Sequence, residues 1–101
     1  MIRHVVALTF KSETQEESIA RITDSLRTLP PIIKEIRSYT LGRDLNLAAD
    51  TADFAIVADF DTLEDFEVYA NHPAHLEVIR EVIKPHVANR TASQFEFDPE
   101  R

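Results

Sequence analysis

A seven-residue stretch, Tyr69-Ala70-Asn71-His72-Pro73-Ala74-His75, places a phenol and two imidazoles within a few residues of one another. An imidazole, with a pKa near 6.5, both accepts and donates protons at neutral pH. A phenol donates a hydrogen bond to groups such as a carbonyl oxygen. These side chains suit general acid–base chemistry, so this stretch is the first candidate for a functional site.

The proline divides this stretch into structural and chemical parts. Proline favours the first position of a helix, so Pro73 predicts a helix start with His72 as its N-cap and His75 in its first turn. A positive ring is disfavoured near a helix N-terminus, which keeps His75 neutral and able to take a proton. Two alternatives stay open: Tyr69 as an amphipathic edge residue, and His75 as a helix-start residue bonded to water. We expect His86 at the surface.

A third histidine lies in the first predicted strand, residues 2–10. The side chains on one face of this strand are Ile2, His4, Val6, Leu8 and Phe10. If helices cover that face, His4 points between the sheet and the helices and can meet Tyr69 and His75. The alternative is a core histidine hydrogen-bonded to the backbone.

Metal and cofactor sites lack their usual signals. The chain has no cysteine, and no carboxylate stands in an obvious ligand pattern with the histidines. Helix capping also competes for His72. No glycine-rich phosphate loop or nucleophile motif is present. We therefore expect no metal site and no cofactor.

Two capping signals and a proline set the predicted helices. Thr14 with Glu17 forms a capping box, and Pro30-Pro31 predicts that this helix ends near residue 29. Thr62 caps a second, shorter helix that ends near Asn71, and Pro73 begins the third.

Strands alternate with these helices. They are predicted over residues 2–10, 35–42, 53–60 and 91–97. The order is that of an α+β, ferredoxin-like protomer: a four-stranded antiparallel sheet with helices on one face. We expect one domain over residues 1–98 and a C-terminal tail over 99–101. Gly42, the single glycine, is predicted to supply a special backbone angle or a close approach.

The layer between sheet and helices is predicted to hold a small-molecule pocket, because apolar walls with a few converging polar groups describe such sites. Its polar groups would be His4, Tyr69 and His75. Its apolar, substrate-binding walls would be Phe10, Phe54, Phe66 and Ile79.

The other sheet face bears on assembly. Val5, Ala7, Ala55 and Val57 fall on it, and exposing them would leave an apolar patch in water. We expect a homodimer with the sheets face to face. The net charge of −7 and the lack of a basic cluster argue against nucleic acid and anionic membranes as partners. With no apolar run long enough for a membrane span, we expect a cytoplasmic protein.

Several segments together resemble the stress-responsive dimeric α/β-barrel (Dabb) family. They are Ile2-Arg3-His4-Val5-Val6 with Phe10-Lys11, then Gly42-Arg43-Asp44, the strand at residues 53–60, and the Tyr69–His75 stretch. The resemblance covers nearly the whole chain, and the tyrosine followed by His-Pro-x-His is its most specific part. It implies a homodimer whose two sheets close into a dimeric α/β barrel.

The resemblance also implies a chemistry. Family members of the olivetolic acid cyclase type perform an intramolecular aldol condensation without a cofactor. By that similarity His75 would be the general base, with Tyr69 and His4 orienting the substrate or polarising its carbonyl. Two other functions are compatible with the family: a non-catalytic stress or interaction dimer, and a haem- or quinol-acting monooxygenase, a class that shares the barrel.

Overall fold

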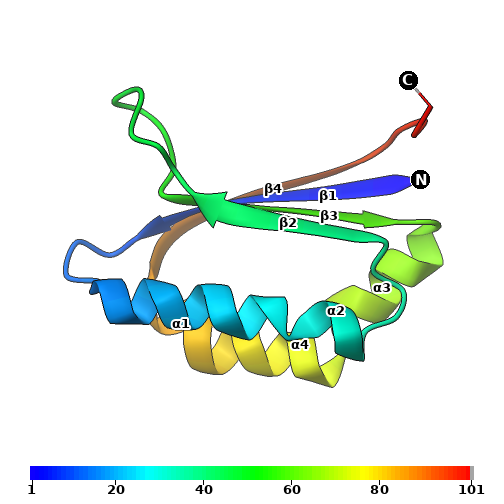
Figure 1. Cartoon of the computed structure of the whole chain (residues 1–101), viewed down its shortest axis with the longest axis horizontal. Coiled ribbons are helices and arrows are strands. Elements are labelled where there is room, and N and C mark those ends of the chain that lie inside the picture. Colours follow the sequence, from blue (N-terminus) through cyan, green and yellow to red (C-terminus); the bar gives the residue numbers. More distant parts are fainter. Residues whose placement is uncertain (101) are drawn as a thin grey trace.

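A four-stranded antiparallel sheet forms one layer of the protein and the helices form the other (Figure 1). The computed structural model describes residues 1–100. The strands lie in the order β2-β3-β1-β4, which confirms the ferredoxin-like α+β fold. Their bounds are β1 Ile2–Phe10, β2 Ser38–Arg43, β3 Phe54–Phe60 and β4 Val87–Glu96.

The helical layer lies against one sheet face only (Figure 1). It consists of α1 Glu16–Arg27, α2 Leu29–Ile32, α3 Leu63–Asn71 and α4 Pro73–Val78. A π-helical turn, η1 (Ile79–Ile83), and a 3-10 turn, η2 (Lys84–His86), continue α4 toward β4. No helix within residues 1–100 is long and apolar enough to cross a membrane.

Two of the predicted helix starts are present. The Thr62 side chain accepts the Asp65 backbone N–H at 3.1 Å and caps α3. His72 Nδ1 accepts the Ala74 N–H at 3.1 Å, so His72 caps α4, and Pro73 is the first residue of that helix. Each cap satisfies a backbone donor that has no partner inside its helix.

The capping box predicted at Thr14 is wrong. Helix α1 begins at Glu16, and its N-cap Gln15 makes no side-chain capping bond. The Thr14 hydroxyl instead donates to the His86 carbonyl at 3.5 Å, and its N–H bonds the Lys11 carbonyl at 3.0 Å. A long-range contact has replaced the local cap.

The first helix ends two residues before the predicted position, and a second, short helix follows it directly. Helix α1 stops at Arg27, and Pro30 and Pro31 lie inside the short helix α2. Prolines fit there because the first turn of a helix needs no N–H donor from them.

Two strand boundaries and the role of Gly42 also differ from the predictions. Strand β2 begins at Ser38, and β4 begins at Val87 and is longer than expected. Strand β4 is mostly exposed and polar, so its first half carries no hydrophobic alternation from which a strand could be predicted. Gly42 has no positive φ, and a Cβ there would meet nothing within 4 Å. It serves neither of the purposes predicted for it.

The two faces of β1 have different surroundings. His4, Val6, Leu8 and Phe10 are buried beneath the helices, where α1 contributes a stripe of Ile19, Ile22 and Leu26. On the other face Val5, Ala7 and Val57 are partly exposed and Ala55 is exposed. Arg3 and Asp59 form a two-pronged ion pair on that face, at 2.8 and 2.9 Å.

Candidate functional site

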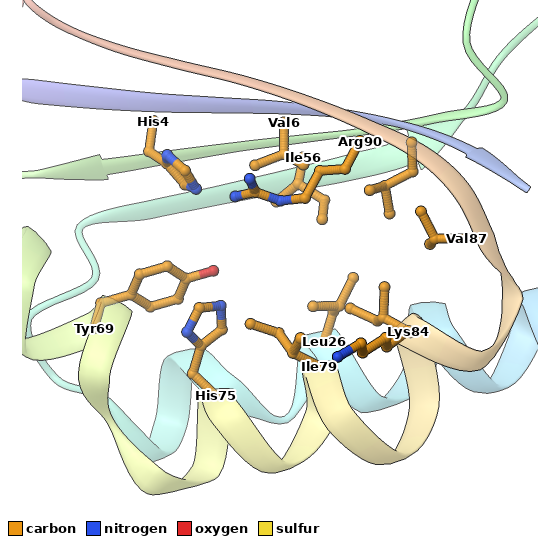
Figure 2. Close-up of a pocket in the computed structure, with 12 residues that line it drawn as sticks. His4, Val6, Leu26, Ile56, Tyr69, His75, Ile79, Lys84, Val87 and Arg90 are labelled. Atoms are coloured by element: carbon orange, nitrogen blue, oxygen red, sulfur yellow. The ribbon is translucent and has the colours of Figure 1, made fainter.

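A cavity of about 370 Å³ lies between the sheet and the helices, and Figure 2 shows the side chains around it. This volume is at the small end of the range for small-molecule sites. Its polar lining residues are His4, Tyr69, His75, Lys84 and Arg90. Its apolar lining residues are Val6, Leu8, Leu26, Ile56, Ile79, Ile83 and Val87.

The sheet wall of the cavity presents His4. The strand pleat turns His4 toward the helices, and the residue is only 5% exposed. Its Nδ1 lies 2.7 Å from Oε1 of Gln94, its direct neighbour on β4. Since an amide oxygen only accepts, Nδ1 carries the proton and Nε2 is left as a base. Burial lowers the pKa of His4, and the charge of Arg90 lowers it further.

The helix wall presents Tyr69 and His75, whose rings stack with their centroids 4.1 Å apart. His75 Nδ1 lies 3.3 Å from the Ala70 carbonyl oxygen, which assigns the ring proton to Nδ1. Its Nε2 is then the basic nitrogen. Burial lowers the pKa of His75, and repulsion from Arg90, and from His4 when that ring is protonated, lowers it further. Both cavity histidines are therefore neutral at pH 7.

A tyrosine pair orients the phenol. The Tyr39 and Tyr69 hydroxyls lie 2.9 Å apart, and their ring centroids are separated by 6.0 Å. Burial raises the pKa of both phenols. The phenols therefore stay protonated and act as hydrogen-bond donors rather than as bases. Tyr39 comes from β2, so segments far apart in the sequence meet at this site: β1 with His4, β2 with Tyr39, β4 with Gln94, and α3 and α4 with Tyr69 and His75.

The structure brings His4, Tyr69 and His75 to one cavity, but it divides the predicted apolar walls. Ile79 lines the cavity. Phe10 and Phe54 pack against each other in the core, with ring centroids 6.1 Å apart, and line other surface hollows. Phe66 packs behind His4 at 5.1 Å and supports that ring instead of lining the cavity. Aliphatic side chains from α1, β1, β3, η1 and β4 form the apolar walls instead.

Four polar residues that the sequence analysis did not select also belong to the site: Tyr39, Lys84, Arg90 and Gln94. The π-helical turn η1 leads into Lys84 and turns Ile79 and Ile83 toward the cavity. Such turns are rare and occur often at functional sites. The alternation of Tyr39 with Leu41 in β2 was an available signal, since both face the core.

A bulge in β4 explains why Val87 and Arg90 both line the cavity. Residues three apart in a regular strand point to opposite faces. Here Thr9 pairs with Asn89 but Phe10 pairs with Val87, so Ala88 is an extra residue in β4. A bulge of this kind re-aims the side chains on either side of it. It cannot be read from the strand's composition.

The histidines are not gathered as metal ligands. Within residues 1–100, no group of three or more His, Cys, Asp or Glu side chains is arranged to hold a metal ion. His72, which is three residues from His75, uses Nδ1 to cap α4.

Comparison with solved structures shows close relatives of this fold. A dimeric ferredoxin-like protein of unknown function from Thermobifida fusca is 35% identical, with a TM-score of 0.88 over 95% of this chain and 90% of that one. A dimeric protein of ferredoxin-like fold from Bacteroides fragilis is 25% identical, with a TM-score of 0.80 over 95% of each chain.

A hydroxynitrile lyase from Passiflora edulis also matches, with a TM-score of 0.85 over 97% of this chain and 96% of the lyase. At 24% identity this likeness shows the fold alone. No curated protein sequence matches this chain. The family model described as the stress responsive A/B barrel domain matches residues 2–97, which is nearly the full length. The chain therefore belongs to the stress-responsive A/B barrel (Dabb) domain family.

Proposed function

We propose that this protein is a cofactor-independent acid–base catalyst that acts beside a carbonyl group of a small molecule. One observation carries the proposal: two histidines, each held at Nδ1, and a tyrosine line one largely apolar cavity. Each histidine is held at Nδ1 by a fixed acceptor, so each directs its basic Nε2 away from that acceptor. Lyase and aldol-type reactions share this requirement for a positioned base and a hydrogen-bond donor.

The step begins with proton abstraction. Nε2 of His75 takes a proton from the carbon next to the carbonyl; the C–H bond breaks, an N–H bond forms and an enolate results. The Tyr69 hydroxyl donates a hydrogen bond to the carbonyl oxygen, where negative charge develops. This step requires Tyr39 to donate across its 2.9 Å contact with the Tyr69 hydroxyl, which leaves the proton of Tyr69 available for the substrate. His4 donates a further hydrogen bond to the same oxygen, or it delivers the proton that the enolate takes up in the next step.

The surroundings favour this chemistry over a purely structural role for the three residues. A structural cluster would fill the layer between sheet and helices, whereas His4, Tyr69 and His75 border a cavity of about 370 Å³. The apolar side chains around it keep the histidines uncharged and strengthen the hydrogen bonds made inside. The competing function, a non-catalytic interaction dimer, gives no reason for such a cavity.

We also infer that the protein acts as a homodimer through the sheet face that carries Val5, Ala7, Ala55 and Val57. Phe95, which pairs with Arg3, is 47% exposed on the same face. The T. fusca relative, at 35% identity, is described as dimeric. A second copy would remove this apolar surface from water.

Deuterium exchange tests the proposed chemistry without knowledge of the natural substrate. A panel of small aryl and alkyl methyl ketones, including 4-phenyl-2-butanone, is incubated with the protein in D₂O. Loss of the proton signals next to the carbonyl is followed by NMR. We expect the wild type to exceed the buffer rate and His75→Ala to match the buffer. A wild-type rate equal to buffer across the panel would refute the proposal.

A further inference from the structure

Arg90 is a positive group in the cavity that the proposed proton transfer does not use. Its side chain extends from β4 along the sheet wall toward His4, and Tyr69 and His75 lie across the cavity from it (Figure 2). Arg90 pairs with Leu8 in the β1–β4 register, four residues from the Gln94 that holds His4. Arg90 and His4 therefore share a sheet face because of the strand pleat, and not through a chance side-chain rotamer.

The guanidinium of Arg90 has no carboxylate partner among residues 1–100. Arg3, Arg37, Arg43 and Arg80 each pair with an acidic side chain, while Arg21 and Arg27, unpaired within the same residues, lie on the exposed surface of α1, away from the cavity. The chain carries 18 acidic residues against 11 basic ones, so carboxylates are abundant. Arg90 is itself solvent-exposed, and it lines an apolar cavity, so an anion entering the cavity from solvent can reach its guanidinium.

The rest of the cavity describes the body of that ligand. Seven aliphatic residues make up the apolar walls, so most of the ligand surface is apolar. Lys84 adds a second positive charge on the wall formed by the helices. The small volume admits a compact molecule. The planar guanidinium fork matches the two oxygens of a carboxylate better than it matches a neutral amide.

We propose that Arg90 recognises a carboxylate on the small apolar molecule that occupies this cavity. This deepens the proposed function and rests on the same cavity: the substrate class becomes small apolar carboxylic acids that also bear a carbonyl. In support, the charge of Arg90 lowers the pKa values of His4, Tyr69 and His75, so its field reaches all three groups. A molecule whose carboxylate binds Arg90 would therefore lie in the same cavity as His4, Tyr69 and His75.

Matched acid and amide probes test this recognition directly. Benzoate, phenylacetate and 3-phenylpropionate are each compared with the corresponding amide, and affinities are measured by calorimetry and NMR titration. The probes need not react, so the result is independent of catalysis. We expect at least one acid to bind the wild type roughly tenfold tighter than its amide, as a charge-assisted hydrogen bond would give.

Two arginine variants identify the residue responsible. Arg90→Gln keeps a long polar side chain and should remove the preference for the acid without moving the unfolding midpoint. Arg80→Gln makes the same change of net charge on an exposed residue paired with Glu81, and should keep the preference. The proposal is overturned if no acid binds more tightly than its amide, or if Arg90→Gln weakens acid and amide equally. If the protein catalyses hydrogen exchange of the ketones but binds no acid more tightly than its amide, the carboxylate inference is refuted and the proposed function stands.

Discussion

The rings of Tyr69 and His75 stack with their centroids 4.1 Å apart and their planes inclined by 29°. In a continuous helix, residues six apart lie about 240° apart around the axis and cannot meet. The break at His72 and Pro73, between α3 and α4, makes the contact possible. The histidine that caps the helix and the histidine proposed as the base therefore have separate roles within one motif.

His75→Ala is expected to lower the ketone exchange rate by about 10²–10⁴-fold, because that is the usual contribution of a positioned general base. His75→Phe should have the same effect while keeping an aromatic ring against Tyr69. The fold and the assembly should survive both changes. Circular dichroism and light scattering check this point. The role of His75 would be structural if His75→Ala lost several kcal/mol of stability and His75→Phe kept its exchange activity.

His72→Ala is the matched control within the motif. It removes the side-chain acceptor for the Ala74 N–H, so we expect a loss of about 1 kcal/mol in the free energy of unfolding. The exchange rate should stay within a few-fold of the wild type, since Nδ1 of His72 serves the helix. A loss of activity as large as that of His75→Ala would assign His72 to the chemistry.

Tyr69→Phe should slow exchange by about 10²-fold, because it removes the donor proposed for the developing oxyanion. Tyr39→Phe leaves that donor in place and only removes its partner at 2.9 Å. It should cost about 0.5–1.5 kcal/mol of stability and slow exchange by a smaller factor. Urea unfolding and the NMR exchange assay measure the two effects. Equal rates for the two variants would contradict the assigned roles.

Stability should fall between about pH 7 and pH 5.5, because the unfolded chain takes up protons that buried His4 and partly buried His75 resist. The pKa of each is lowered by burial, so the unfolded state binds more protons as pH drops through about 6.5. Each unit of lowering is worth about 1.4 kcal/mol. The double variant His4→Gln, His75→Gln should show a smaller fall in unfolding free energy, measured at one protein concentration.

His86→Gln is the control for the pH experiment, because His86 lies outside the main cavity lining. It should leave the slope of stability against pH as it is in the wild type. An unchanged slope in the double variant would show that other groups govern this pH range. The measurement stays above about pH 5 so that carboxylate protonation contributes little.

Val57→Glu should convert the inferred dimer to monomer, because it buries a charge at the centre of the exposed sheet face. Val68→Glu makes the same change on the outer surface of α3, where Val68 is 43% exposed, and should leave the dimer intact. Light scattering across a dilution series gives the mass of each. A monomeric wild type would refute the inferred interface.

The local sequence determined most of the fold. Alternation in residues 2–10 and 53–60 specified β1 and β3, and short-range bonds at Thr62 and His72 specified two helix starts. These features depend on side chains within a few residues of one another. The family likewise follows from sequence, since the matching model spans residues 2–97. The motif also identifies Tyr69 and His75 as candidate site residues, although it does not predict that their rings stack.

Only the tertiary structure decided how the site is completed. Tyr39, Gln94 and Arg90 come from β2 and β4, and their partners are 30 or more residues away or lie across the cavity. The bulge at Ala88 and the π-helical turn η1 set which side chains face the cavity, and neither leaves a periodic signal. Phe10 and Phe54 show the converse: their apolar character predicted burial, but packing put them in the core and left the cavity walls to aliphatic residues. Sequence spacing records which face of an element is buried, whereas the register between strands and the path of the backbone determine what that face meets.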